Sequence, residues 1–354
     1  MTVTDHLSTI AAPMVNQSDL PFRRLVRRYG TSLAYTQMLL PERLLSDQDY
    51  LEFHLRDLGS ESDRPVVVQL CGNDPQLVVE AGKKVQGACD AIGVWALDLN
   101  LGCPQEAARD AHYGAYLLGQ KDWPLVESIV SAMSHSFTVP VSTKIRLCQP
   151  VSATLDFAQR LEAAGSAWLA LHARTVSARR RRQGAADLEQ VKRLKENLTI
   201  PVVSNGNVRT WEDVENNRAY TEADGIMVGE ILLANPCLFA NETPDPVLIS
   251  LEYLELCREH PGAATLQTVQ THVRHFVDHR CGRRPWFNKF RVALNNCRTV
   301  DDIDHLLRLK VQRWRGLEPL APDAQGSDES TETSDYEDGR DGPEDAMSAL
   351  SLLE

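Results

Sequence analysis

The first 240 residues alternate between short apolar runs and longer amphipathic segments. The apolar runs have the length and β-branched content of buried strands, and lie at 8–13, 33–36, 65–71, 95–100, 140–146, 168–172, 200–204 and 225–228. Between most of them lie segments with helical spacing and helix-start signals, at 20–29, 75–86, 125–136, 154–164, 187–195 and 211–218. This alternation favours a (β/α)8 TIM barrel, with an open doubly wound sheet as the alternative.

After residue 240 the pattern changes. A Pro-containing connector at 241–246 precedes helical patterns at 247–260, 265–279, 286–295 and 301–315. Beyond residue 320 the chain is acidic and rich in Ser, Thr, Asp and Gly, so it is predicted to be disordered. We therefore expect an α/β fold with a barrel domain at 1–240, a small helical domain at 241–320 and a disordered acidic tail at 321–354.

The charge is distributed unevenly between these parts. The formal charge is -12, but the tail holds 11 acidic residues and one basic residue, which leaves 38 acidic and 36 basic residues in the other 320. Residues 274–315 carry 11 Lys or Arg against four Asp. Such a basic face on a near-neutral body is typical of phosphate binding, and from charge alone a solvated helix surface is an equal alternative.

The eight cysteines are never closer than 14 positions, so no C-x-x-C pair supports a zinc, iron–sulfur or thioredoxin-type site. No apolar run is long enough to cross a bilayer, and residues 1–10 lack the features of a secretory signal. Reduced thiols suit the cytoplasm or nucleus. We expect a cytoplasmic or nuclear monomer that uses neither a metal nor a membrane.

The stretch LNLGCPQ, at 99–105, joins the end of a predicted strand to a fixed thiol. Asn100 ends the apolar run, Gly102 allows a sharp turn, and Cys103 precedes a proline. The thiol could serve as a nucleophile, a metal ligand or a proton donor, or it could simply fill space as a small apolar side chain.

Polar residues follow nearly every predicted strand at its C-terminal end. In a barrel these ends share one rim, where barrel enzymes place their active sites. The residues are Met14, Asn16, Gln37, Gln69, Asn100, Cys103, Lys144, Arg146, His172, Arg174, Asn205 to Asn207, Gly229 and Glu230.

Two of these strand ends suggest a ligand. SNGNV at 204–208 and MVG at 227–229 offer small residues and free backbone N–H groups where barrels commonly hold a phosphate. Lys144 and His172 would point to the same ligand, and Gln69 could hydrogen-bond the edge of a flat ring. These contacts describe a flavin mononucleotide (FMN) site, whereas no G-x-G-x-x-G motif supports a Rossmann-type dinucleotide site.

Several motifs together resemble tRNA-dihydrouridine synthases, and the branch that modifies uridines 16 and 17 in particular. They cover about 230 residues in the family's order, and LNLGCP followed by HYGA is the most specific of them. The segments are 12–30, 34–39, 64–75, 98–118, 143–146, 171–176, 200–208 and 235–240.

The resemblance implies an FMN-binding barrel and a helical domain that grips tRNA. It implies that Cys103 is the catalytic acid, that Asn100 and Arg174 face a flipped uridine, and that NADPH or NADH reduces the flavin, which then passes a hydride to C6 of uracil. We also expect Arg283 and Arg284 to bind tRNA. The residues implied to line FMN are Pro13, Met14, Gln69, Lys144, His172, Asn205, Gly206, Asn207, Gly229 and Glu230.

The implied proton transfer is chemically reasonable for a thiol. With an ordinary pKa of about 8.5, Cys103 is protonated at neutral pH yet a better acid than Lys or Tyr, and needs no deep burial. Lys144 or Arg174 could stabilise negative charge on the uracil oxygens.

Two stretches depart from the family pattern, and two other functions stay open. Residues 92–97 look inserted, and the run Arg179 to Arg182 replaces a small, Gly-rich loop.

One alternative function is that of an FMN barrel oxidoreductase that acts on a small pyrimidine, against which the basic residues at 274–315 argue. The other is a non-catalytic RNA-binding relative.

Overall fold

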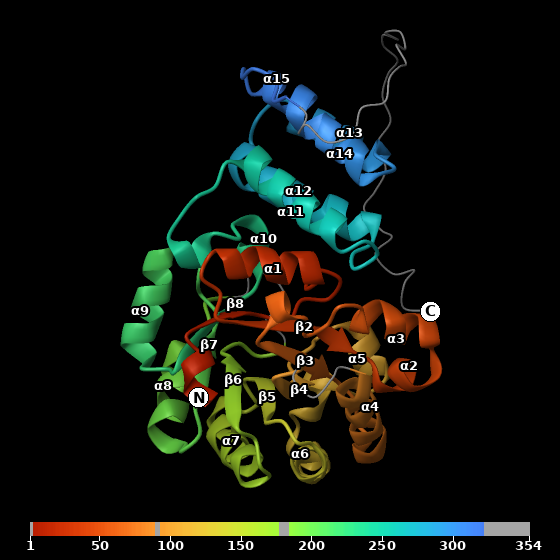
Figure 1. Cartoon of the computed structure of the whole chain (residues 1–354). Coiled ribbons are helices and arrows are strands. Elements are labelled where there is room, and N and C mark those ends of the chain that lie inside the picture. The colour runs from red at the N-terminus through yellow and green to blue at the C-terminus, as the bar shows by residue number, and fades with distance from the viewer. Residues whose placement is uncertain (1–2, 89–92, 177–183, 322–354) are drawn as a thin grey trace. The chain divides into compact units, whose positions relative to one another are not determined.

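In the computed structural model of the chain, residues 3–88, 93–176 and 184–321 are described (Figure 1). Within them, eight parallel strands pair in chain order and β8 pairs with β1, which closes a barrel. The predicted TIM barrel is therefore confirmed, and the open sheet is wrong. The strands are β1 (Thr9–Ala11), β2 (Leu33–Leu39), β3 (Val66–Leu70), β4 (Ala96–Leu101), β5 (Val141–Arg146), β6 (Trp168–His172), β7 (Val202–Asn205) and β8 (Gly225–Val228).

Helices surround the barrel, as Figure 1 shows. Six were predicted: α1 (Leu20–Arg28), α4 (Pro75–Ala88), α6 (Trp123–Ser136), α7 (Thr154–Ala163), α8 (Leu188–Asn197) and α9 (Trp211–Thr221). The sequence interpretation missed α2 (Pro41–Ser46), α3 (Gln48–Leu55), α5 (Glu106–Asp110) and α10 (Glu230–Ala234). None of the described helices is long and apolar enough to cross a membrane.

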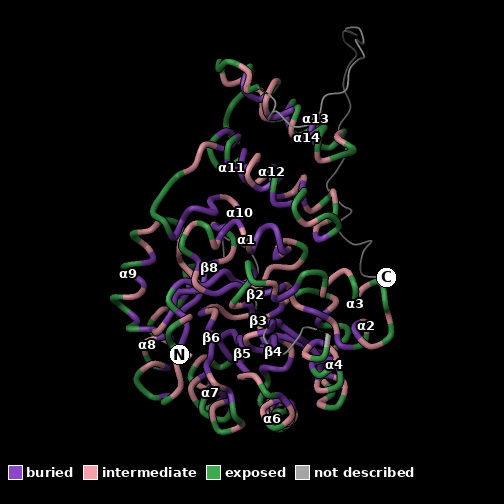
Figure 2. Tube along the Cα trace, viewed as in Figure 1, coloured by how far each residue is buried: buried purple, intermediate pink, exposed green. Residues whose placement is uncertain are grey.

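The strands bury both of their faces, which explains their nearly continuous apolar sequences (Figure 2). Inside the barrel, Trp168, Tyr35 and Met227 belong to one buried cluster, and the Trp168 indole N–H donates to the Tyr35 hydroxyl at 3.1 Å. A larger apolar cluster lies between the strands and the surrounding helices. This packing fixes the strand ends that carry the polar residues of the rim.

The C-terminal helices follow the predicted segments closely. They are α11 (Pro246–Glu259), α12 (Leu266–Cys281), α13 (Phe287–Asn296), α14 (Val300–His305) and α15 (Gln312–Trp314). The helix expected over 301–315 is instead α14, a π-helical stretch at Leu306–Val311, and α15. Residues 1–320 form one compact unit, so the boundary at 240 stays a prediction, and the tail from residue 322 lies outside the described residues.

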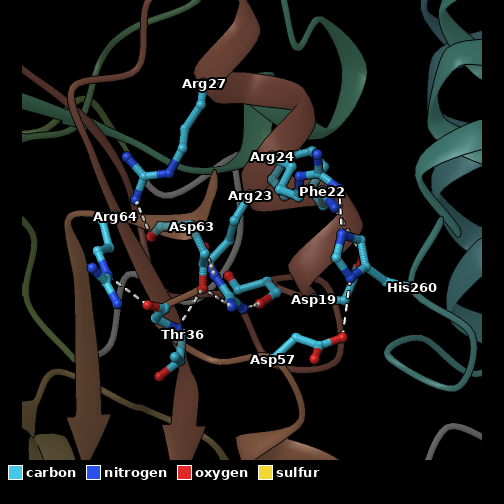
Figure 3. Close-up of polar contacts among 12 residues, drawn as sticks. Asp19, Phe22, Arg23, Arg24, Arg27, Thr36, Asp57, Asp63, Arg64 and His260 are labelled. Atoms are coloured by element: carbon cyan, nitrogen blue, oxygen red, sulfur yellow. Dashed lines mark hydrogen bonds and ion pairs between the residues drawn. The ribbon is translucent and has the colours of Figure 1, made fainter. Parts of the chain in front are cut away.

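Helix α1 joins the barrel to α11 and α12 through a set of contacts that we call the α1 junction. At its buried centre, Asp19 accepts hydrogen bonds from the Tyr253 hydroxyl at 3.1 Å and from the His272 ring at 2.7 Å. At its exposed edge, His260 contacts Asp57 at 3.0 Å and also Arg24 (Figure 3). The helical region is therefore attached to the barrel by a buried polar contact as well as by apolar packing.

One turn further along, α1 is anchored to the barrel by a buried ion pair. The Arg23 guanidinium binds the Asp63 carboxylate through two hydrogen bonds, at 2.9 and 2.5 Å, and both side chains are almost fully buried (Figure 3). Arg27 donates to the Asp63 carbonyl at 3.0 Å, and burial lowers its pKa to about 10. These contacts hold α1 against the loop before β3.

Candidate active site at the mouth of the barrel

The loop after β4 holds Cys103 from two sides. The Asn100 side-chain oxygen accepts the backbone N–H groups of Gly102 at 3.0 Å and Cys103 at 2.9 Å. On the other side, the Cys103 carbonyl accepts the Ala115 N–H at 3.1 Å. Gly114 has a φ of +64°, and a Cβ there would lie 3.0 Å from the Cys103 carbonyl oxygen, so only glycine suits this close approach. The thiol therefore sits on a fixed backbone.

Cys103 is buried, with 9% of its surface exposed. Burial raises the pKa of its thiol, and the nearby charges of Arg146 and Lys144 offset only part of that rise. The expectation of an unperturbed thiol that needs no burial is therefore corrected, because Cys103 packs in one buried cluster with Cys71, Ala108 and Tyr113. A thiol with a raised pKa is protonated at neutral pH, which suits a proton donor better than a nucleophile.

Lys144 and His172 lie at the ends of the next two strands. The pKa of Lys144 is lowered to about 8, mainly by burial and secondly by the positive charge of Arg146, while Asp98 opposes the shift. Burial, followed by the positive charge of Lys144, keeps the pKa of His172 well below its ordinary value. Within the described residues, the Lys144 ammonium makes no hydrogen bond or ion pair. The rim therefore presents a buried cation beside a neutral imidazole.

Gln69 and Asn100 bind each other and a third residue, Asp98. The Gln69 amide nitrogen donates to the Asp98 carboxylate at 2.8 Å, and its oxygen accepts from the Asn100 amide at 2.7 Å. Both the amide nitrogen and the amide oxygen of Gln69 thus bind other residues inside the barrel, and one N–H remains for a ligand. The expected hydrogen bond from Gln69 to the edge of a flat ring stays a prediction. The sequence interpretation missed Asp98, although a carboxylate inside the apolar strand ALDLNL was a usable signal.

In the loop after β7, no side chain covers the backbone at Gly206, as expected of a phosphate-binding loop. Gly206 has a φ of +135°, and a Cβ there would lie 2.6 Å from the Ala186 Cβ. Asn207, with a φ of +56°, binds both backbone groups of Ala186, accepting at 2.7 Å and donating at 2.8 Å. Asn205 donates to the Met227 carbonyl at 2.8 Å. The two asparagine side chains therefore shape the loop rather than extend from it.

Residues after β1 and β8 meet at the same side of the rim. A Cβ on Gly229 would lie 3.4 Å from the Ala12 Cβ and 3.6 Å from the Met14 sulfur, which is ordinary contact. Pro13 and Met14 are half-buried, and Glu230 is exposed at the start of α10.

Arg174 follows β6 and also lies at the rim. It donates weakly to the Asn207 side-chain oxygen at 3.4 Å, and its Nε is buried without a partner in the described structure. A buried guanidinium nitrogen of this kind is a donor that a bound anion or carbonyl could satisfy.

The remaining predicted residues lie elsewhere. Arg283 and Arg284 are exposed between α12 and α13, in the helical region rather than at the rim. The run Arg179 to Arg182 lies outside the described residues, as does Ile92, whereas Ala96 and Leu97 begin β4. No group of three or more His, Cys, Asp or Glu side chains in the described ranges is placed to hold a metal ion.

Comparison with known proteins identifies the family. A family model described as dihydrouridine synthase (Dus) matches residues 9–313. The tRNA-dihydrouridine(16/17) synthase-like protein of Mus musculus is 35% identical over 303 residues, which are 86% of this chain and 62% of that protein. The tRNA-dihydrouridine(16/17) synthase of Saccharomyces cerevisiae is 39% identical over 233 residues, 65% of this chain and 53% of that protein.

A more distant relative and two solved structures complete the comparison. The human tRNA-dihydrouridine(20a/20b) synthase-like protein is 33% identical over 256 residues, 72% of this chain and 77% of that protein. A 2-naphthoyl-CoA reductase shares the fold with a TM-score of 0.54 at 11% identity, over 67% of this chain and 50% of that one. A histamine dehydrogenase from Rhizobium does so with a TM-score of 0.51 at 13% identity, over 70% of this chain and 48% of that one.

Proposed function

Because this chain belongs to the dihydrouridine synthase family, we propose that it reduces the C5–C6 double bond of uridines in the D-loop of tRNA to dihydrouridine. The observation that carries the proposal is the buried Cys103 thiol, held on a hydrogen-bonded backbone at a barrel mouth that also carries Lys144. The chain spans 62% and 53% of two relatives named for positions 16 and 17, and the names of these relatives include NAD(P)+.

We propose FMN as the bound cofactor, because the donors at the rim fit its parts. The Lys144 ammonium makes no hydrogen bond within the described residues and suits a carbonyl group of a flavin ring. The buried Arg174 Nε, which has no partner there, suits a carbonyl group of the uridine that Arg174 is expected to face. The bare backbone at Gly206 suits a phosphate, because no side chain there could stand between the ligand and the N–H groups. When bound and reduced by NADPH or NADH, the flavin supplies the hydride that adds to C6 of uracil.

The protein supplies the other half of the reduction, a proton at C5. Cys103 donates it and becomes a thiolate, which the adjacent positive charges of Lys144 and Arg146 stabilise until solvent returns a proton. The same Lys144 charge stabilises negative charge that develops on the uracil oxygens. Because Cys103 and Lys144 are buried at the barrel mouth, a uridine must leave its stack to reach them.

We propose that the C-terminal helices bind the tRNA backbone. Helix α13, with the sequence FNKFRVALNN, contains cations and amides and no acidic residue. Cations there and nearby are exposed, namely Arg280, Arg283, Arg284, Lys289, Arg291, Arg298, Lys310 and Arg313. Phosphate contacts from such a face would offset the energy of unstacking the uridine.

The decisive experiment combines flavin absorbance with turnover of tRNA from cells that lack this protein. The purified wild type should be yellow or take up FMN, and should form dihydrouridine with NADPH or NADH. Cys103→Ala should keep the flavin and its reduction but lose about 100-fold or more of dihydrouridine formation. The control is Cys71→Ala, which removes another buried thiol of the same cluster.

Three results would contradict the proposal. A colourless protein that cannot take up FMN would favour a non-catalytic RNA-binding protein. Reduction of a free pyrimidine without any dependence on salt would favour a small-molecule enzyme, since tRNA binding through phosphates must weaken as salt rises. Unchanged turnover in Cys103→Ala would remove Cys103 from the acid role.

We also propose that the protein works in a reducing compartment, the cytoplasm or the nucleus. Seven cysteines fall within the described ranges, and all seven are free thiols. The expected monomeric state stays a prediction.

A further inference from the structure

A line of hydrogen bonds joins residues of the neighbouring strands β3, β4 and β5 to the Cys103 loop. The Ser142 hydroxyl donates to one oxygen of Asp98 at 2.6 Å, and the Gln69 amide nitrogen donates to the other at 2.8 Å. The Asn100 amide nitrogen then donates to the Gln69 oxygen at 2.7 Å. Finally, the Asn100 oxygen accepts the backbone N–H groups of Gly102 and Cys103. Asp98 thus connects to the thiol loop through two amide side chains.

The chemistry of the carboxylate determines the direction of every bond in this line. An ionised Asp98 can only accept, so Gln69 must turn its nitrogen toward Asp98 and its oxygen toward Asn100. Asn100 must then turn its nitrogen toward Gln69, which leaves its oxygen free for the two backbone N–H groups. If the direction were reversed, the Asn100 nitrogen would face two other donors and the loop would lose its anchor.

Burial makes this direction costly to disturb. Ser142, Asp98 and Gln69 have no exposed surface, and Asn100 is 8% exposed. A buried donor or acceptor left unpaired has no water to replace its partner, so the members of such a network are ordered together. Burial raises the pKa of Asp98 to about 6, and the carboxylate therefore predominates at neutral pH.

We propose that Asp98 is a positioning residue that holds the Cys103 thiol in place by setting the orientation of the Gln69 and Asn100 amides. The inference rests on the proposed function, in which Cys103 is the proton donor. Asp98 itself need not touch the substrate, because it acts on the thiol only through the two amides and the backbone of the 102–103 turn.

The test is to move the carboxylate from one end of the line to the other. Asn100→Asp alone places acceptors at both ends of Gln69, which can donate to only one of them. Adding Asp98→Asn restores a complete set of bonds in the opposite direction. The carboxylate introduced by Asn100→Asp then accepts from the loop and from Gln69, while the amide introduced by Asp98→Asn donates to Gln69 and accepts from Ser142.

Two further variants separate charge from hydrogen bonding. Asp98→Leu keeps the branched shape of the side chain but leaves the Gln69 amide N–H and the Ser142 hydroxyl without their Asp98 acceptors. Asp98→Asn can still offer its oxygen to Gln69, because the Ser142 hydroxyl can rotate to accept from its nitrogen. The control is Thr143→Val on the same strand, which removes a buried hydroxyl that contacts Ser166 at 3.1 Å and has no bond to this line.

The first readout is the rate at which iodoacetamide alkylates Cys103, measured by peptide mass spectrometry over a pH series with Cys297 as the internal reference. The pH series separates the thiol's pKa from its accessibility. The second readout is dihydrouridine formation, and the third is the midpoint of thermal unfolding.

Asp98→Leu and Asn100→Asp should change the limiting alkylation rate by about 10-fold and lower turnover on the order of 100-fold, as expected for a displacement near 1 Å. In Asp98→Asn and in the double variant, the alkylation rate of Cys103 should stay within about 3-fold of the wild-type rate. The same holds for the control Thr143→Val. The inference is overturned if the double variant resembles Asn100→Asp, or if Thr143→Val changes alkylation as much as Asp98→Leu. If the wild type forms no dihydrouridine, the proposed function fails, and the alkylation series still tests the positioning.

Discussion

Replacing Asp19 with Ala is predicted to loosen the attachment of α11 and α12 to the barrel. Its carboxylate caps α1 by accepting the Phe22 N–H at 3.0 Å, and it also accepts from Tyr253 and His272, both fully buried. Losing the cap costs about 1 kcal/mol, and each buried donor left unpaired costs about 1–3 kcal/mol. We therefore expect the free energy of unfolding to fall by about 3–7 kcal/mol, a large part of a typical total.

Urea unfolding of the full chain, followed by circular dichroism, measures this loss. The matched control is Asp57→Asn, which alters an exposed Asp–His contact with His260 across the same junction and should change stability by less than about 0.5 kcal/mol.

A double-mutant cycle with His272→Phe isolates the buried contact. The new ring would keep the stacking that His272 makes with Phe22, at 4.6 Å between centroids, and would need no acceptor. In this background Asp19→Ala should cost at least about 1 kcal/mol less than in the wild type. An equal cost in both backgrounds, or a loss below about 1 kcal/mol in the wild type, would refute the reasoning.

Three further predictions follow from the rim and the basic region. Arg283→Ala combined with Arg284→Ala should weaken tRNA binding and flatten its salt dependence without changing flavin content, as titrations at several salt concentrations would show. Gly206→Ala should lower flavin content, measured by absorbance, because its Cβ would lie 2.6 Å from the Ala186 Cβ. Burial lowers the pKa of Lys144 to about 8 from 10.5, so the unfolded chain binds more protons between these values. Stability relative to Lys144→Met should therefore rise with pH in that window, by at most about 1.4 kcal/mol per pH unit, in urea unfolding at each pH.

Matched controls decide each of these. Lys83→Ala with Arg193→Ala removes two exposed cations from barrel helices and should leave tRNA affinity unchanged; equal weakening would mean that only net charge matters. Gly184→Ala also has a positive φ, of +98°, but nothing within 4 Å, so equal flavin loss there would exclude the steric argument. A stability difference from Lys144→Met that stays flat between pH 8 and 10.5 would contradict the assigned cause.

The sequence pattern predicted the barrel because its strands are buried on both faces and read as apolar runs. The sequence pattern gave wrong bounds or missed an element where a strand is irregular or a helix is short. Strand β2 was expected to end at Thr36 but continues to Leu39, because a register shift between Tyr35 and Met38 interrupts the regular pattern. The short helices α2 and α3 were missed because their few apolar positions give no clear period.

At the site, the strand ends could be predicted but the partners of their side chains could not. A parallel barrel necessarily places Cys103, Lys144 and His172 on one rim. The pairing of Asn207 with Ala186, by contrast, joins two loops that are 21 positions apart, and no spacing rule specifies it. The burial of Cys103 likewise depends on the approach of Gly114, which only the folded chain reveals.

The α1 junction has a consequence for substrate choice. Only a short turn separates Met14 at the rim from Asp19, and the Ser18 hydroxyl stiffens this turn by binding the Met14 N–H at 2.9 Å and the Ala12 carbonyl at 3.3 Å. The short turn therefore fixes the position of the C-terminal helices relative to the rim that carries Cys103. Under the proposed function, an RNA held at a fixed place would present one particular nucleotide to the thiol, and lengthening this turn would change which nucleotide that is.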